Sequence, residues 1–213
     1  MIQKIITVIT YYYKYFLKKL KVKSSSKELF DGDDALFKKI LLKDTRVYAE
    51  YGCGDSSIWV TNETDVRKVY SVDTSMEWVK NVENLIKKKE GGDIKFIDCG
   101  SVGEWGRPVD YSERNNFINY TDWIWQQKDK PDTVLIDGRF RVCCFLTCLK
   151  NANPGTKIIF DDYIFRSYYH IVEEFVNRAE VNRRQCLFIV PDKSEINMDS
   201  INSEIKNFRY VME

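Results

Sequence analysis

From residue 45 onward the chain alternates short β-prone runs with segments of helical period, and this alternation constrains the fold more than any other feature. The predicted strands are 46–51, 68–72, 94–97, 133–136, 157–160 and 186–190. Strands joined through helices pair in parallel, because each crossover returns the chain to the same end of the sheet. The pattern predicts an α/β fold with a doubly wound, mostly parallel sheet and helices on both faces.

Three of the connecting segments carry apolar residues at helical spacing. The first, over 79–86, follows Thr74 and Glu77, whose spacing predicts a capping box. The second covers 142–149 and ends before a Pro-Gly turn, and the third covers 168–176. These segments predict three amphipathic helices packed on the sheet.

Length and charge limit the domain count and the partners. The 213 residues suffice for one well-buried domain, predicted over 31–213, after an N-terminal basic aromatic helix and linker over 1–30. A net charge of +1 gives no general attraction to nucleic acid. Residues 1–23 carry six lysines and no acid. The predicted helix there would pack on the domain or on a second subunit of a homo-oligomer, or make peripheral contact with a membrane surface, and disorder of the segment is the third alternative.

The location of the protein is predicted from its cysteines and its apolar stretches. The six cysteines form no CxxC pair and most lie within apolar runs, which predicts reduced, buried thiols. The longest N-terminal apolar stretch, 5–13, is far below the ~20 residues that span a bilayer. We therefore expect a cytoplasmic protein, with membrane association through residues 1–23 left open.

Acidic residues end the first three predicted strands, and two glycines follow the first of them. Glu50 precedes Gly52 and Gly54, Asp73 ends the second strand, and Asp98 ends the third. Ligands of such sheets bind beyond the carboxyl ends of the strands, where glycines allow close approach of the backbone. Several carboxylates suit a positively charged nucleoside without phosphates better than they suit a dinucleotide.

The motifs that carry these acids resemble those of class I S-adenosylmethionine (SAM)-dependent methyltransferases. EYGCG at 50–54, SVD at 71–73, DCG at 98–100 and LIDG at 135–138 are similar to the family's motifs in order and strand position. The resemblance covers most of 45–190 and implies SAM as cofactor. It implies as cofactor-binding residues Glu50, Tyr51, Gly52, Gly54, Ser56, Asp73, Asp98 and Cys99.

Two related classes of protein fit less well. A dinucleotide-binding enzyme needs a third glycine near position 57, where this chain has Ser57. The nucleic-acid methyltransferases carry NPPY or DPPY after the fourth strand, or a Pro-Cys nucleophile, whereas this chain has DGRF at 137–140 and no Pro-Cys. A small molecule rather than nucleic acid is the predicted acceptor.

An aromatic insert over 100–128 separates the third and fourth strands and contains three of the five tryptophans. Aromatic faces at the edge of the sheet can line a ligand pocket, and Trp105 in the EWGRP turn is the predicted contact. The alternative is that these aromatic residues anchor an extra helix.

A second group of acids follows strands four and five. Asp137, Asp161 and Asp162 are the predicted catalytic residues, as base or as ligands of Mg²⁺. DDY at 161–163 resembles the macrocin O-methyltransferase group of sugar methyltransferases, although Arg139 stands where that group tends to have an acid. The positive charge of Arg139 disfavours binding of a metal ion. The alternative is that arginines pair with the aspartates and fix the loops. The predicted substrate-binding residues are Trp105, Arg139, Arg141 and Tyr163.

Two functions remain open. The first is a SAM-dependent O-methyltransferase that acts on a hydroxyl of a small molecule, preferably a sugar or glycan unit. In that reaction the enzyme aligns the acceptor oxygen with the methyl group and removes its proton. The second is a SAM-binding or degenerate protein that acts by association with a membrane or a partner. The only histidine, His170, is predicted to lie on the surface, with a catalytic role as the alternative.

Overall fold

The computed structural model describes residues 28–87 and 91–213, so the predicted basic helix of residues 1–23 lies outside the described residues. The described chain falls into a short first unit that ends at Gly32 and a second unit, Asp33–Glu213. Of the first unit only residues 28–32 are described, and they contain the 3₁₀ turn η1 (Phe30–Gly32). The second contains the whole sheet and the helices that surround it.

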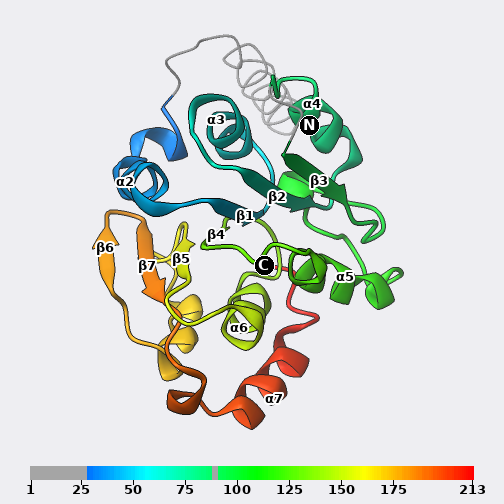
Figure 1. Cartoon of the computed structure of the whole chain (residues 1–213). Helices are drawn as coiled ribbons and strands as arrows, with labels where there is room; N and C mark the ends of the chain where they lie inside the picture. Colours follow the sequence, from blue (N-terminus) through cyan, green and yellow to red (C-terminus); the bar gives the residue numbers. More distant parts are fainter. Residues whose placement is uncertain (1–27, 88–90) are drawn as a thin grey trace, which may run out of the picture. The chain divides into compact units, whose positions relative to one another are not determined.

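The second unit is built on one seven-stranded sheet with the order β3-β2-β1-β4-β5-β7-β6 (Figure 1). Its strands are β1 (Val47–Tyr51), β2 (Lys68–Asp73), β3 (Gly92–Phe96), β4 (Thr133–Ile136), β5 (Lys157–Phe160), β6 (Glu180–Asn182) and β7 (Gln185–Ile189). The first five strands pair in parallel, and β7 is antiparallel to both its neighbours. The predicted mostly parallel α/β sheet is confirmed, and each predicted strand overlaps an observed one.

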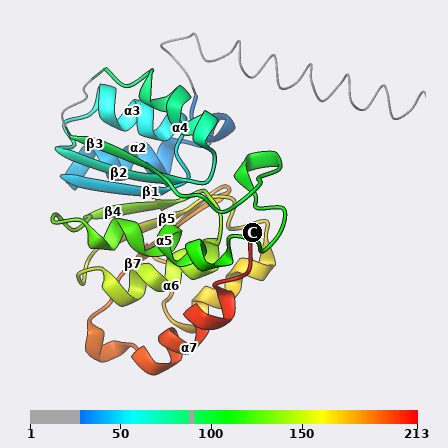
Figure 2. The same ribbon diagram turned by 90° about the vertical axis from the view of Figure 1, so that its right-hand side faces the viewer.

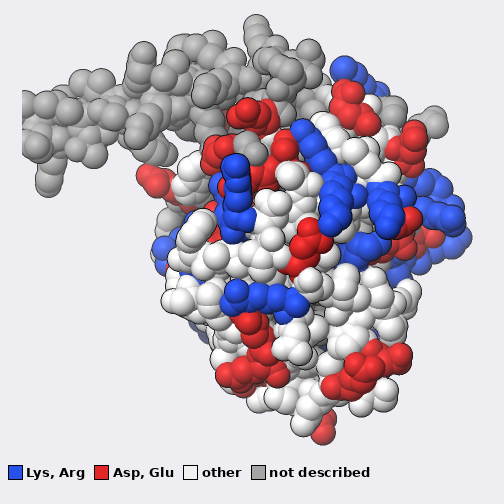
Figure 3. Space-filling view, turned by 90° about the vertical axis from the view of Figure 1, so that its left-hand side faces the viewer, with Lys and Arg blue, Asp and Glu red and all other residues white. Residues whose placement is uncertain are grey.

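The edge strand β6 was not predicted. It has three residues and forms a hairpin with β7, in which Arg183 adopts a φ of 49°. The edge carries ion pairs from Lys39 to Glu180 (2.8 Å) and from Arg183 to Asp33 (2.6 Å). On the face shown in Figure 3, Lys and Arg side chains lie beside Asp and Glu side chains. Charged edges of this kind disfavour pairing with a further strand.

Helices cover both faces of the sheet (Figure 2). One face carries α2 (Ala35–Asp44), α3 (Asp55–Glu63) and α4 (Met76–Glu83), and the other carries α5 (Phe117–Asp122), α6 (Arg141–Asn151) and α7 (Met198–Phe208). Because both faces are covered, β1 and β4 are buried along their whole length.

Two helix predictions need correction. The N-cap of α4 is Ser75, whose Oγ accepts the amide of Trp78 at 3.3 Å, and Thr74 instead donates to the carbonyl of Gly106 at 2.5 Å. The third predicted helix is a 3₁₀ helix, η5 (Ser167–Glu174), of which only Tyr169 and Val172 are buried. In a 3₁₀ helix the side chains at i and i+3 eclipse, so its buried stripe is narrower than an α-helical one.

The main core lies between the sheet and α5, α6 and α7. All six cysteines are free and buried, as predicted. The insert forms short helices, η2 (Glu104–Gly106), η3 (Arg114–Asn116), α5 and η4 (Trp123–Gln126). Trp125 of this insert is buried and anchors η4 in the core, which is the alternative interpretation for part of the insert. No helix among the described residues is long and apolar enough to cross a bilayer.

Candidate functional site

The carboxylate of Glu50 is fully buried at the end of β1 and is surrounded by hydroxyl groups. Ser56 and Ser57, in the first turn of α3, donate to its two oxygens, the first at 2.7 Å. Tyr48 donates at 2.8 Å and Ser71 at 2.6 Å. Burial raises the pKa of Glu50, while the four hydroxyl donors oppose that shift. Glu50 therefore fixes the turn from β1 into α3.

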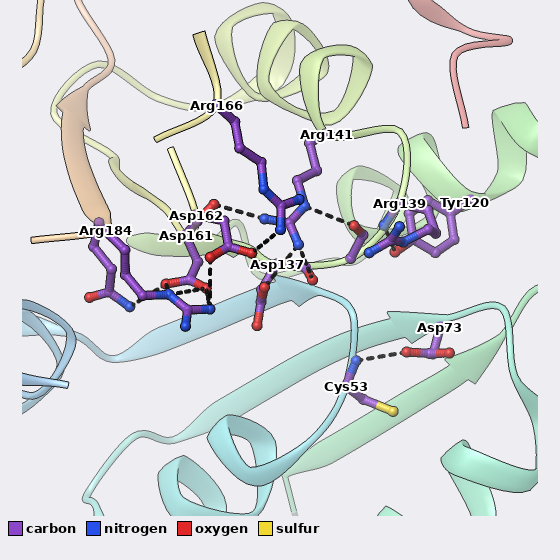
Figure 4. A network of polar contacts seen from close by, with 12 residues as sticks. Cys53, Asp73, Tyr120, Asp137, Arg139, Arg141, Asp161, Asp162, Arg166 and Arg184 are labelled. Atoms are coloured by element: carbon purple, nitrogen blue, oxygen red, sulfur yellow. Dashed lines mark hydrogen bonds and ion pairs between the residues drawn. The ribbon is translucent and has the colours of Figure 1, made fainter. Parts of the chain in front are cut away.

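Asp73 ends β2 beside that turn. Its carboxylate accepts the amide of Cys53 at 3.1 Å and that of Ser75 at 2.8 Å, and Figure 4 shows the first of these contacts. Burial raises the pKa of Asp73, and the backbone amides lower it. The side chain is only half-buried, so it can still receive hydrogen bonds from a ligand at the rim.

Asp98 follows β3 and is exposed, and it accepts the amide of Gly100 at 3.0 Å. The adjacent Cys99 is fully buried, and burial raises its pKa to about 12. Because β3, β2 and β1 are parallel neighbours, Glu50, Asp73 and Asp98 lie at one edge of the sheet. We call these three residues the acidic rim. None of the described cations is ion-paired with any of them.

The two motif glycines have different surroundings. Gly52 has a φ of 93°, and a Cβ there would lie 2.7 Å from the Cα of Gly138. Only glycine therefore permits the turns after β1 and β4 to meet. A Cβ at Gly54 would come no closer than 3.8 Å to its nearest neighbour, Nε1 of Trp78. A small side chain would therefore fit at Gly54 in ordinary contact with Trp78, which also donates to the carbonyl of Cys53 at 2.6 Å.

Trp105 lies in the turn that reaches back to the acidic rim. It adopts a φ of 59°, and 71% of it is exposed. Its neighbour Gly106 accepts a hydrogen bond from Thr74, and a Cβ on Gly106 would be 3.6 Å from the Asp73 carboxylate. The structure therefore holds the Trp105 turn beside Asp73, with the indole at the surface.

Asp137 directly follows β4, next to the meeting point of Gly52 and Gly138. Its amide donates to the carbonyl of Tyr51 at 3.1 Å, and its carboxylate is ion-paired with Arg141 at 3.1 Å. About a third of the side chain is exposed, 32%. Burial raises the pKa of Asp137 to about 7, and the charge of Asp161 adds to the shift. This pKa places the Asp137 carboxyl close to neutral pH.

Asp161 and Asp162, after β5, are held by arginines (Figure 4). Arg184, at the β6–β7 turn, is ion-paired with the fully buried Asp161 and with Asp162 at 3.0 Å. Arg166 pairs with Asp162 at 2.6 Å. Arg141 donates to the carbonyls of Gly138, Asp137 and Asp161 at 2.7–3.0 Å. We call Asp137, Asp161, Asp162, Arg141, Arg166 and Arg184 the Asp–Arg cluster.

The Asp–Arg cluster matches the alternative that the sequence left open, in which arginines fix the loops. Over residues 28–87 and 91–213 no group of three or more His, Cys, Asp or Glu side chains has the arrangement of a metal site. Each predicted Mg²⁺ ligand instead faces a guanidinium. A cation would have to displace these partners in order to bind.

Arg139 differs from the other three arginines. Its amide donates to the hydroxyl of Tyr120 at 3.1 Å. Its side chain is half-buried, and the buried Nε has no hydrogen-bond partner among the described residues. Burial lowers the pKa of Arg139, and the neighbouring charge of Arg141 lowers it further. The guanidinium lies within electrostatic reach of Asp73 and Asp137.

The side chains of two predicted site residues lie in the core. The hydroxyl of Tyr51 donates to the carbonyl of Thr121 at 2.7 Å and accepts Nε1 of Trp125 at 2.9 Å. Tyr163 is fully buried and donates to Glu173 at 2.7 Å. These tyrosines could contribute to a ligand site only through their backbone. His170, which was predicted to lie on the surface, is half-buried, with its ring centroid 4.9 Å from that of Tyr163.

Sequence reasoning missed several residues of the site: Ser57, Ser71, Trp78, Tyr120 and Arg184. Ser71 had a usable signal, because it pairs in register with Glu50 across β1 and β2. Arg184 had none, since it reaches Asp161 from a hairpin that the sequence did not reveal.

Comparisons with known proteins support a methyltransferase fold. No protein-family model matches the sequence, and no curated protein matches it significantly. A methyltransferase-like protein from Silicibacter pomeroyi DSS-3 is 26% identical over 88% of this chain and 98% of its own, with a TM-score of 0.75.

Two further solved structures are less similar. The O-methyltransferase from Bacillus cereus, in complex with S-adenosylhomocysteine (SAH), is 13% identical over 82% of this chain and 86% of its own, with a TM-score of 0.48. The N-methyltransferase NodS from Bradyrhizobium japonicum WM9, also in complex with SAH, is 12% identical over 78% of this chain and 90% of its own, with a TM-score of 0.48. From the order of the seven strands and the likeness to the Silicibacter protein, the chain has the Rossmann-like fold of class I methyltransferases.

Proposed function

We propose that this protein is a SAM-dependent methyltransferase that methylates a hydroxyl of a small molecule. The observation that carries the proposal is the acidic rim beside the glycine turn at Gly52 and Gly54. Its carboxylates are satisfied by hydroxyl and amide donors, and none of them forms an ion pair with a described cation. A ligand that brings positive charge and hydroxyl groups is the complement of such a rim.

The acids of the rim fit SAM in different ways. Asp73 is half-buried and would accept hydrogen bonds from the ribose hydroxyls, as acids at the end of a second strand do in related folds. Asp98 would lie on the adenine side. Glu50 is fully buried, so it would act by holding the turn, and through its field, rather than by direct contact.

Asp137 is proposed as the general base. When bound, SAM supplies a methyl group activated by a sulfonium, whose transfer to the acceptor oxygen leaves SAH. The acceptor hydroxyl must lose its proton, and Asp137 would take it. A carboxylate with a pKa of about 7 is a good match for proton removal near neutral pH. Asp161 and Asp162 would hold Arg184 and Arg166 in place and are not proposed to contact the acceptor.

A sugar or other hydroxylated ring is the acceptor we favour. Trp105 presents an exposed indole on a turn fixed beside Asp73, and aromatic faces of this kind pack against sugar rings. We do not include Mg²⁺ in the proposal, because the candidate ligands Asp137, Asp161 and Asp162 are already ion-paired with arginines.

Calorimetric titration of the full chain with SAM and with SAH tests the proposal. We expect saturable binding of both. Release of SAH from SAM is then followed during a screen of hydroxylated acceptors with and without an anionic group. Absence of SAM binding at millimolar concentration would overturn the proposed function.

A further inference from the structure

We propose that Arg139 binds an anionic group of the acceptor, so that the substrate is a hydroxylated small molecule bearing a carboxylate, phosphate or sulfate. The inference rests on the proposed function, because it assigns a substrate class to the same site. The sequence left two roles open for these arginines, namely binding the acceptor or pairing with the aspartates. We assign the first role to Arg139 and the second to Arg141 and Arg166.

The four arginines near Asp137 are not equivalent. Arg141, Arg166 and Arg184 each form at least one ion pair with an aspartate of the Asp–Arg cluster. Arg139 forms no ion pair with any described residue, and its Nε is buried without a partner. An unpaired, partly buried cation is costly, and the nearby charge of Arg141 makes it more so. An anion that binds there would remove this cost.

The position of Arg139 links it to the acceptor. It lies two residues after the proposed base, in the turn that meets Gly52, and its amide is held by the hydroxyl of Tyr120. Figure 4 shows it beside Tyr120, on the side of the Asp–Arg cluster toward Asp73. The three aspartates of the Asp–Arg cluster are ion-paired with Arg141, Arg166 and Arg184, which leaves the Arg139 guanidinium beside the base without an ion pair to a described residue. An acceptor whose anionic group bound Arg139 would have a hydroxyl near Asp137.

The carboxylate of SAM itself is the competing ligand for Arg139. The two assignments differ in what a bound cofactor does. SAH carries the same carboxylate, so it would occupy Arg139 if that residue held the cofactor. If Arg139 binds the acceptor, the residue stays accessible in the SAH complex.

Sulfate serves as the probe. The thermal unfolding midpoint of the full chain, saturated with SAH, is measured as sulfate replaces chloride at constant ionic strength. Binding to the folded state raises the midpoint. We expect Arg139→Ala to raise the apparent sulfate dissociation constant about tenfold or more, because a charge-assisted hydrogen bond is lost. Arg139→Lys should retain part of the binding, since it keeps the charge without the planar fork.

Arg67→Ala is the matched control, since 70% of the Arg67 side chain is exposed and its nearest acid is 4.0 Å away. It should bind sulfate as the unchanged protein does. Equal sulfate binding by Arg139→Ala would overturn the proposal. Loss of sulfate binding on addition of SAH, together with weaker SAH binding by Arg139→Ala, would assign Arg139 to the cofactor instead. Failure of SAH to bind would count against the proposed function. Sulfate titration without SAH would still test whether Arg139 binds an anion.

Discussion

The two halves of the sheet rim stabilise their carboxylates in different ways. At the ends of β1, β2 and β3, Glu50, Asp73 and Asp98 accept hydrogen bonds from hydroxyls and backbone amides. At the ends of β4 and β5, arginines neutralise Asp137, Asp161 and Asp162. Neutral donors form hydrogen bonds with a carboxylate but leave its negative charge uncompensated. A guanidinium forms hydrogen bonds and also compensates the charge. The first half therefore stays electronegative, and the second carries excess positive charge at Arg139.

This difference would let one edge of the sheet bind two ligands of opposite charge. A cationic nucleoside is attracted to the acidic rim and an anionic acceptor to Arg139, and the meeting point of the two halves is the contact between Gly52 and Gly138. Asp137 lies at that point. The variants below test the two halves separately.

Removal of the Glu50 carboxylate should have the largest effect. Glu50→Ala leaves four hydroxyls without their buried acceptor and should lower the free energy of unfolding by about 4 kcal/mol. Glu50→Gln should cost less, because the amide retains one acceptor oxygen. Urea unfolding measures both. The exposed Glu63→Ala is the control, and a loss below about 1 kcal/mol for Glu50→Ala would show that the hydroxyls find other partners.

In the second half, the matching change is Arg184→Ala. It leaves the fully buried Asp161 without its cation and should lower the free energy of unfolding by about 3 kcal/mol. Urea unfolding of Arg67→Ala, which breaks an exposed pair, should show a loss of about 0.5 kcal/mol or less. Similar losses for the two arginines would mean that the Asp–Arg cluster does not stabilise the fold beyond a surface pair.

Asp73→Ala tests the acidic rim as a cofactor site. Loss of an ionised acceptor for the ribose hydroxyls should weaken SAM binding about 100-fold, equivalent to about 2.7 kcal/mol. Calorimetric titration measures the affinity, and circular dichroism checks that the turn held by the Cys53 amide survives. Asp93→Ala, an exposed acid in β3, should leave the affinity unchanged. Unchanged affinity in Asp73→Ala would place the ribose elsewhere.

The smallest effect is the pH dependence expected from Asp137. As a base it must be ionised, so the rate of methyl transfer should fall about tenfold for each pH unit below its pKa of about 7. The residual activity of Asp137→Asn should not show this fall in rate below pH 7. A flat profile in the unchanged protein would exclude Asp137 as the base.

The same group makes stability depend on pH. Its pKa is raised in the folded state, so the folded protein holds that proton more tightly than the unfolded chain does. The contribution to stability is present below the ordinary pKa of 3.8 and is lost as pH rises toward about 7. The free energies of unfolding of the unchanged protein and of Asp137→Asn are measured at several pH values. The difference between them should grow as pH rises over this interval.

Local patterns identified the sheet but not its last hairpin. The five parallel strands were predicted because each is a short apolar run bounded by helical segments, and their order in the sequence fixes which ends meet. The strand β6 has three residues and little apolar character, and its pairing depends on a turn with Arg183 at a φ of 49°. The helix cap moved from Thr74 to Ser75 because Thr74 is used by the Gly106 turn, a contact between segments 32 residues apart.

The sequence by itself determined that acids and glycines end consecutive strands, because residue type and the period of the pattern are local properties. Only the tertiary structure decided how each acid is satisfied, since the hydroxyl of Ser71 and the guanidinium of Arg184 reach their carboxylates from distant parts of the chain. It also separated Arg139 from its three neighbours. Charge compensation depends on distances between side chains across the fold, and these are absent from any one-dimensional pattern.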